Sequence, residues 1–205
     1  MRRTKQQTAE TRQQIVKSAS ALFRERGVDG VSVAEVMDKA GLTHGGFYKH
    51  FESKEALLTE AIADAFANSM CAWEETIAKQ ADGQLTIQAL INLYLSEKHL
   101  NDTAFGCPAA ALGTEIARYV GGSKKCFAAG VKGMIGVFEK HLECENASDR
   151  KDLAVTTVAC LVGTLMIARC AENDKTAQSY TEASNKTLLR FLSSLNPRVI
   201  EGAKH

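Results

Sequence analysis

The sequence contains few of the residues that interrupt helices or favour strands. Among its 205 residues are only two prolines, Pro108 and Pro197, and aromatic side chains make up 6%. Because proline breaks helices and aromatic residues are enriched in strands, this scarcity favours an all-α protein. The low glycine and proline content excludes collagen-like and low-complexity chains, and 45% apolar residues are too many for a disordered chain.

Secretion and membrane signals are also lacking. Residues 1–5 are followed by polar side chains instead of the apolar core of a secretory signal. The longest apolar stretch, residues 153–168, is shorter than the ~20 residues that span a bilayer. The six cysteines form no C-x-x-C pair, so the usual zinc-site spacing is missing. We therefore expect a cytoplasmic protein with reduced thiols, no membrane segment, and no metal or other cofactor.

Charge is unevenly distributed along the chain. The whole sequence has a net charge of +1, but residues 1–26 hold seven Lys or Arg against two Glu, a net charge of +5. A basic end on an otherwise near-neutral protein points to a polyanionic partner for that end. A solvated helix face with a short charged tail is the alternative interpretation.

Apolar spacing predicts three short helices in a domain of residues 1–53. Ser32 and Glu35 form a capping box at the start of the second helix, since each side chain can bond the other's backbone N–H. Gly41 allows a tight turn, and Thr43 is a suitable N-cap for the third helix. The predicted helices are residues 9–26, 33–40 and 44–50.

The remaining residues, 54–205, predict a second helical domain, for about nine helices in all. Ser53 is a suitable N-cap for its first helix, Pro108 fits the first position of its third, and Ser148 or Asp149 fits the start of its fifth. The predicted helices are residues 54–80, 86–100, 108–119, 123–143, 148–171 and 176–195.

The second and third helices, joined by a glycine turn, form the pattern of a helix-turn-helix. Leu42, Phe47 and Phe51 are expected to anchor the third helix on the second, which leaves its polar side chains facing outward. Small residues at the helix start allow the backbone to approach a DNA groove, and a helix N-terminus favours a nearby phosphate.

This stretch resembles the TetR/AcrR-type transcriptional regulators over about 50 residues. The similar motifs are F-R-E-R-G at residues 23–27, V-A-E-V-M-D-K-A-G-L at 33–42 and G-G-F-Y-K-H-F-E-S-K-E at 45–55. The resemblance implies that the first domain binds a palindromic double-stranded DNA operator. It also implies a homodimer formed by the last two helices, and an effector-binding region that begins near Trp73. Beyond these motifs, the likeness is one of helix number and length.

The resemblance also implies roles for individual residues. Tyr48 and Lys54 match positions that contact phosphates, and the first residues of the chain could form an arm over the minor groove. A half-buried Tyr48, a Lys54 that only starts a helix, and a merely solvated His44 are the alternatives. The residues assigned to DNA are Arg2, Arg3, Lys5, Thr43, His44, Gly45, Gly46, Tyr48, Lys49, His50 and Lys54.

Three residues are candidates for ligand or redox sensing: Cys107, Trp73 and Cys126. Cys107 precedes Pro108 at an expected helix N-terminus, whose dipole lowers a thiol pKa and favours the reactive thiolate. Some members of the resembled family have a Gly-Cys at a similar place and sense oxidants or electrophiles. The alternative is that Cys107 is a small buried residue and the inducer is a hydrophobic molecule.

The middle of the predicted 123–143 helix contains Gly130, Gly133 and Gly136, which allow either close helix packing or pocket volume. The function predicted from the whole sequence is a homodimeric repressor, released from DNA by a small hydrophobic ligand or by thiol modification. No H-E-x-x-H, G-x-S-x-G or P-loop motif is present, so we expect no enzyme. Alternatives are an unrecognised all-α enzyme, with His99, His141 and the cysteines in a non-standard metal site, and a repurposed protein-interaction module.

Overall fold

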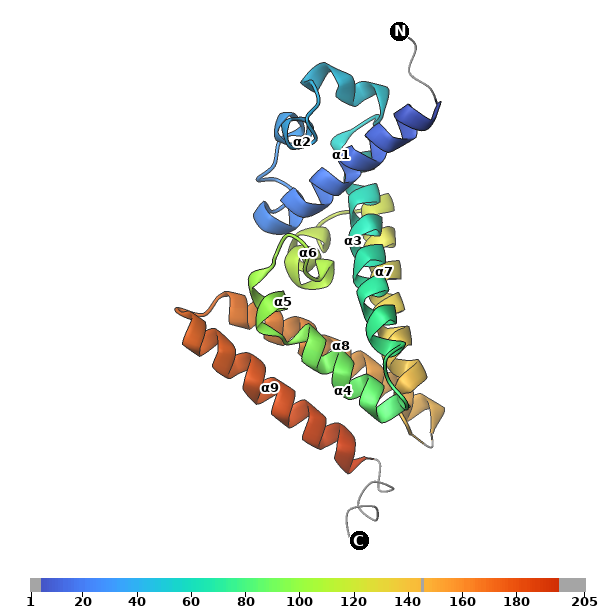
Figure 1. Cartoon of the computed structure of the whole chain (residues 1–205), viewed down its shortest axis with the longest axis vertical. Coiled ribbons are helices and arrows are strands. Elements are labelled where there is room, and N and C mark those ends of the chain that lie inside the picture. The colour runs from blue at the N-terminus through green and yellow to red at the C-terminus, as the bar shows by residue number, and fades with distance from the viewer. Residues whose placement is uncertain (1–4, 145, 196–205) are drawn as a thin grey trace. The chain divides into compact units, whose positions relative to one another are not determined.

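The structure, a computed structural model, describes residues 5–144 and 146–195. These residues form nine α-helices and one 3-10 helix, η1, and no strand occurs among them, which confirms the predicted all-α class. Figure 1 shows the helices in chain order from blue to red. They are α1 (Lys5–Arg26), α2 (Val33–Lys39), η1 (His44–Lys49), α3 (Lys54–Ile77), α4 (Gly83–Tyr94), α5 (Glu97–Asn101), α6 (Pro108–Ile116), α7 (Gly122–His141), α8 (Ala147–Arg169) and α9 (Asp174–Ser194).

The helices pack into two compact units. The first comprises the described residues up to Ser69 together with Asp102–Gly130, and the second comprises Met70–Asn101 with the described residues from Val131 on. The sequence predicts a boundary between residues 53 and 54. The first unit extends beyond it because α6 packs against α1, which brings residues far along the chain into the N-terminal core.

The first unit is built on α1, α2 and η1, which lie beside one another in Figure 1. Phe23 of α1 and Phe47 of η1 are fully buried in its core. Gly27, with φ of +75°, ends α1, and Gly41, with φ of +67°, makes the turn between α2 and η1. Both glycines adopt the left-handed conformation that other residues avoid, so these two turns depend on glycine.

In the second unit, α8 and α9 pack along each other, and Thr164 donates a hydrogen bond to Ser184 between them at 2.9 Å. Arg169, in the last turn of α8, donates to the carbonyl oxygens of His99 and Leu100 in α5. These bonds satisfy carbonyl groups that the end of α5 leaves without intrahelical partners.

Several helix ends differ from the predictions. The expected helix over residues 86–100 is divided into α4 and α5, because the Ser96 hydroxyl accepts the His99 backbone N–H and starts a new helix. Asn146, not Ser148 or Asp149, is the N-cap of α8. The capping box of Ser32 and Glu35 is confirmed.

Helix α8 is long and apolar. It is 23 residues long and reaches a mean hydropathy of 1.6, which is long and apolar enough to cross a membrane by length and composition alone. Only 39% of its apolar window is buried within the chain. Its exposed large apolar side chains are Val155 and Ile167.

Candidate DNA-binding surface and effector region

The recognition segment is η1, held on an aromatic base. The Phe47 ring stacks on Phe51 with centroids 5.7 Å apart and meets the Tyr48 ring edge-on at 5.2 Å. Phe47 and Phe51 are buried, as predicted, whereas Leu42 is only half-buried. The segment is a 3-10 helix of six residues, in keeping with two glycines that lower α-helical propensity. Thr43 occupies the N-cap position, but its hydroxyl makes no capping hydrogen bond, contrary to the prediction.

The polar side chains of η1 face outward. Tyr48 is 71% exposed, so the half-buried alternative is wrong. Thr43, His44, Gly45 and Lys49 are also exposed, and Gly46 and His50 are half-buried. A β-carbon at Gly45 would meet no atom within 4 Å, so the backbone there is open to an approaching surface.

A depression of about 620 Å³ lies between the first turns of α1 and the recognition segment. Hydroxyls of Thr8, Thr11 and Thr43, the Lys49 ammonium and the His50 imidazole are among the polar groups around it. No carboxylate is among its described lining residues, and the groups that border it suit an anion better than a cation. Its lining residues are Thr8, Thr11, Met37, Gly41, Leu42, Thr43, Gly46, Lys49 and His50.

Lys54 has an intramolecular role that the sequence pattern does not reveal. Its ammonium donates a 2.6 Å hydrogen bond to the carbonyl oxygen of Val28 and lies 5.9 Å from the centroid of the Phe23 ring. The Val28 N–H donates to a carboxylate oxygen of Glu115, on α6, at 2.7 Å. Both the N–H and the carbonyl oxygen of Val28 are thus hydrogen-bonded, and these two bonds hold the turn between α1 and α2. A phosphate contact of Lys54 remains a prediction.

Arg12 connects α1 to the end of the recognition segment and to α3, and sequence reasoning missed it. Its guanidinium donates to the carbonyl oxygen of His50, pairs with Glu60 of α3 and lies 4.1 Å above the Phe51 ring. One signal was available, since Arg12 lies three residues before the buried Ile15 and so continues the core-facing stripe of α1.

Glu35 is the most strongly shifted carboxyl of this surface. The pKa of Glu35 falls to about 2, first because the backbone N–H of Ser32 donates to it, then because Arg26 and the Ser32 hydroxyl do. This network holds the start of α2, the helix against which η1 packs.

The remaining predicted contacts lie at the start of the chain. Lys5 is the exposed first residue of α1. Arg2 and Arg3 lie outside the described residues, so the minor-groove arm stays a prediction.

Comparison with known proteins assigns this surface to a family. Residues 15–61, which contain α2, η1 and their flanking turns, match the family described as bacterial regulatory proteins, tetR family. Residues 15–61 of this chain are therefore of the TetR type. The earlier resemblance is therefore confirmed.

Two TetR-type relatives and one solved structure show how far the similarity extends. Over 80 residues the chain is 31% identical to the HTH-type transcriptional repressor KstR2 of Rhodococcus jostii, covering 39% of each protein. Over 65 residues it is 42% identical to the regulator TtgR of Pseudomonas putida, covering 32% of this chain and 30% of TtgR. The matches thus span well under half the length of these relatives. A TetR transcriptional regulator from Chloroflexus aurantiacus has the same fold, with a TM-score of 0.80 at 24% identity over 92% of this chain and 96% of that one.

The candidate sensing residues lie outside the matched segment and fall in different surroundings. Trp73 is buried and meets the rings of Phe138 and Tyr94 edge-on, at 5.5 and 6.3 Å, in the core of the second unit. Cys126 donates to the Thr59 carbonyl oxygen at 3.5 Å, and burial raises the pKa of its thiol. Both environments indicate a packing role, because the Trp73 ring is enclosed and the raised pKa keeps the Cys126 thiol protonated.

Cys107 lies at the N-cap of α6, with Pro108 at the first helical position, as predicted. Its side chain makes no capping bond and is 3% exposed. The buried guanidinium of Arg24 donates to the carbonyl oxygen of Gly106 at 2.9 Å and interacts electrostatically with Cys107. Burial lowers the pKa of Arg24, whereas Asp64 and then Cys107 raise it.

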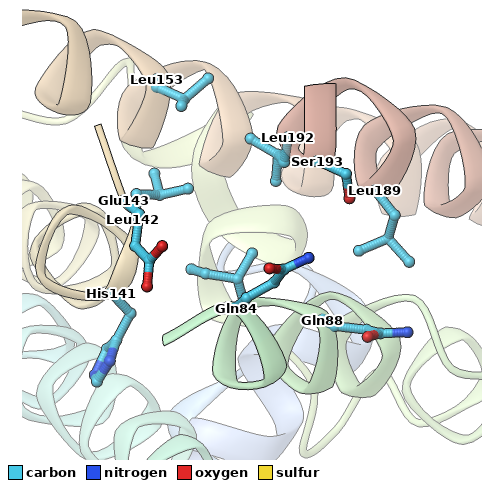
Figure 2. A pocket seen from close by; sticks show the side chains of 10 residues that line it. Gln84, Gln88, His141, Leu142, Glu143, Leu153, Leu189, Leu192 and Ser193 are labelled. Atoms are coloured by element: carbon cyan, nitrogen blue, oxygen red, sulfur yellow. The ribbon is translucent and has the colours of Figure 1, made fainter. Parts of the chain in front are cut away.

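A cavity of about 110 Å³ lies in the second unit, and we name it the α4–α9 cavity. Figure 2 shows Gln84 at its centre, with Leu142 and Glu143 on one side and Leu189, Leu192 and Ser193 on the other. Its lining residues are Gln84, Ile87, Gln88, His141, Leu142, Glu143, Leu153, Leu189, Leu192 and Ser193. In the described residues, no group of three or more His, Cys, Asp or Glu side chains is arranged to hold a metal ion.

Proposed function

We propose that this chain is a cytoplasmic transcriptional repressor that binds double-stranded DNA through η1 and acts as a binding protein, not as an enzyme. The observation that carries the proposal is the outward face of η1, where Tyr48, Lys49 and His44 are exposed above the buried Phe47–Phe51 pair. Such a segment enters a major groove with its polar residues against bases and backbone. The anion-favouring depression beside it suits the flanking phosphates.

The test is fluorescence anisotropy with duplex DNA selected from a random pool by the purified chain. Tyr48→Phe removes only the hydroxyl of an exposed ring, and we expect about tenfold weaker binding if that hydroxyl donates to a phosphate. Lys49→Met should reduce the dependence of affinity on salt by about one released ion. Lys186→Met, an exposed lysine on α9, is the matched control and should change neither quantity. Selection that enriches no sequence, with no binding to the unselected pool, would contradict the proposal.

A homodimer through α8 and α9 completes the proposed function, because two recognition segments are needed to read a palindromic operator. The support is the apolar surface that these two helices leave uncovered within one chain. A second copy would remove this surface from water, which is the main driving force for association. The exposed large apolar residues on the two helices are Val155, Ile167, Tyr180 and Phe191, and Leu195 follows them directly.

Sedimentation measures this association directly. Ile167→Glu and Phe191→Glu each place a charge in the proposed interface, so we expect monomers at concentrations where the unchanged chain is dimeric, together with weaker operator binding. Phe105→Glu alters a more exposed aromatic residue outside α8 and α9 and should leave the dimer intact. Dimers that persist in both α8 and α9 variants would refute this interface.

Release from DNA is proposed to follow from binding of a small hydrophobic molecule in the second unit. An inducer can shift the equilibrium only if it binds the DNA-free conformation more tightly than the DNA-bound one. The long helix α3 is the proposed connection, since it begins at the recognition segment and has residues in both units.

A second candidate for release is oxidation of Cys107. A buried guanidinium near the thiol and the positive end of α6 both favour the thiolate, the form that attacks peroxides. The low exposure of the thiol means that oxidation requires local opening of the loop before α6. Cys107→Ser should bind DNA and lose any response to hydrogen peroxide, whereas Cys126→Ser should retain it. Equal peroxide sensitivity of Cys107→Ser and the unchanged chain would eliminate this candidate.

A further inference from the structure

Helix α6 is attached to the end of α1 at two places, both within the first unit. Just before α6, the guanidinium of Arg24, only 4% exposed, donates a 2.9 Å hydrogen bond to the carbonyl oxygen of Gly106. In the last turn of α6, a carboxylate oxygen of Glu115 accepts the backbone N–H of Val28 at 2.7 Å. The two attachments are separated by about the length of α6. Because two points fix both the position and the direction of a helix, α6 and the end of α1 are held as one piece.

The Glu115 carboxylate lies where only glycine leaves room for it. A β-carbon at Gly27 would overlap this carboxylate, and the φ of Gly27 is +75°. The turn after α1 therefore depends on glycine for two independent reasons, the left-handed backbone and the close approach of Glu115. A side chain of α6 is thus built into the turn that leads to the helix-turn-helix.

The bond to Val28 lies on a continuous path from α6 to the recognition segment. The carbonyl oxygen of Val28 accepts the ammonium of Lys54, the first residue of α3. The turn leads into α2, against which η1 packs. Helix α1 also reaches the end of η1 directly, because Arg12 donates to the carbonyl oxygen of His50. A displacement of the turn would therefore move the supports of η1 on α1, α2 and α3.

We propose that Glu115 is a positioning residue for DNA binding, which fixes the turn at Gly27 and Val28 from α6 and thereby sets the orientation of η1. This inference rests on the proposed function and deepens it, since it names a residue that regulates the affinity of that surface. A displacement of α6 that breaks the Val28 bond lowers DNA affinity without altering any residue that touches DNA. Helix α6 is thus a second connection to the recognition segment, besides α3. The sequence assigned no role to Glu115.

The charge of Glu115 and its hydrogen bond have opposite effects on DNA affinity. A carboxylate repels the phosphate backbone, so removal of its charge alone would leave DNA binding equal or slightly tighter. Loss of the bond to Val28 would weaken DNA binding, because the recognition segment is then held less firmly. The direction of the change therefore separates positioning from simple electrostatics.

Fluorescence anisotropy with the selected duplex measures this direction. Glu115→Ala removes the acceptor and keeps a good helix former, and we expect about fivefold weaker DNA binding with an unchanged dependence on salt, since no phosphate contact is lost. Glu115→Gln retains a side-chain oxygen that can accept the Val28 N–H, and its affinity should stay within about twofold of the unchanged chain. Asp29→Asn removes an exposed carboxylate from the same turn and is the matched control, which should bind no more weakly than the unchanged chain.

Amide hydrogen exchange of Val28, followed by NMR on the full chain without DNA, tests the bond itself. We expect exchange at least tenfold faster in Glu115→Ala than in the unchanged chain, and protection restored in Glu115→Gln. If Glu115→Ala fails to fold by circular dichroism, Glu115→Asp replaces it, because it keeps the charge and shortens the side chain. Equal Val28 exchange, or DNA binding by a folded Glu115→Ala as tight as that of the unchanged chain, would overturn this role alone. No DNA binding by the unchanged chain would refute the proposed function and this role together.

Discussion

The ammonium of Lys54, in the first turn of α3, donates a 2.6 Å hydrogen bond to the carbonyl oxygen of Val28 in the turn after α1. The two residues are 26 positions apart, and the bond fixes the start of α3 relative to the helix-turn-helix. Because the Val28 N–H is held by Glu115, the turn is anchored on α3 and α6 together. A lysine that the sequence assigns to DNA therefore also maintains the geometry of the DNA-binding unit.

Lys54→Met tests this structural role. It keeps the aliphatic stem and removes the donor, so we expect the free energy of unfolding in urea to fall by about 1 kcal/mol. Lys49→Met removes an exposed lysine of η1 and should leave stability unchanged while weakening DNA binding. Equal unfolding midpoints for Lys54→Met and the unchanged chain would contradict the role assigned to the Val28 bond.

Arg12 and Glu60 should contribute modestly to stability but more to DNA binding. Both side chains are about two-fifths exposed, so solvent screening limits their coupling energy in a double-mutant cycle to about 0.5–1 kcal/mol. Arg12→Met also deprives the His50 carbonyl of its donor, and we expect weaker operator binding because the end of η1 loses its support. Lys17→Met, an exposed cation on the same helix, is the control. If both variants weaken DNA binding equally, Arg12 acts only through its charge.

Two glycines of α7 should respond in opposite directions to alanine. A β-carbon at Gly130 would overlap the Phe66 ring, so Gly130→Ala should destabilise the chain by about 1–3 kcal/mol. Gly136 has no atom within 4 Å of that position, and Gly136→Ala should stabilise the helix by about 0.5–1 kcal/mol. Thermal unfolding of both variants measures the contrast. Destabilisation by Gly136→Ala would indicate that the open space at this position is filled in solution.

The start of α2 should be sensitive to acid in a defined range. Folding lowers the pKa of Glu35 from 4.5 to about 2, so its stabilising effect is complete above pH 4.5 and disappears as the pH falls to about 2. A carbon-detected NMR titration of the Glu35 carboxyl measures this value directly. Glu35→Gln should remove this contribution to the pH dependence of stability, and an apparent pKa near 4.5 in the unchanged chain would show that the capping box is absent in solution.

Most features of the DNA-binding surface could be predicted from the sequence. The capping box of Ser32 and Glu35, the turn at Gly41 and the buried Phe47 and Phe51 all depend on residues close together in the chain. Local spacing therefore determines them, because hydrogen bonds and packing between near neighbours form from the helix geometry itself. The exposed position of Tyr48 follows from the same period.

Two helix boundaries were not predicted correctly, although they too depend on residues close together in the chain. The division of α4 from α5 depends on whether the Ser96 hydroxyl caps a new helix or stays on an unbroken one, and apolar spacing is compatible with both. The same ambiguity placed the start of α8 at Ser148 or Asp149 when Asn146 is the N-cap. Where several neighbouring polar residues could serve as the N-cap, the direction of the chain segment before the helix decides which one does.

An all-α chain with a TetR-type recognition segment follows from residues that are close together, because helix periodicity, caps and glycine turns are encoded over a few positions. The contact of Glu115 with Val28, 87 residues earlier, and the cavity that Gln84, Glu143 and Leu192 line arise from the tertiary structure. Such contacts depend on how helices pack, and helix packing follows from the fit of whole surfaces and not from the spacing of residues within one helix.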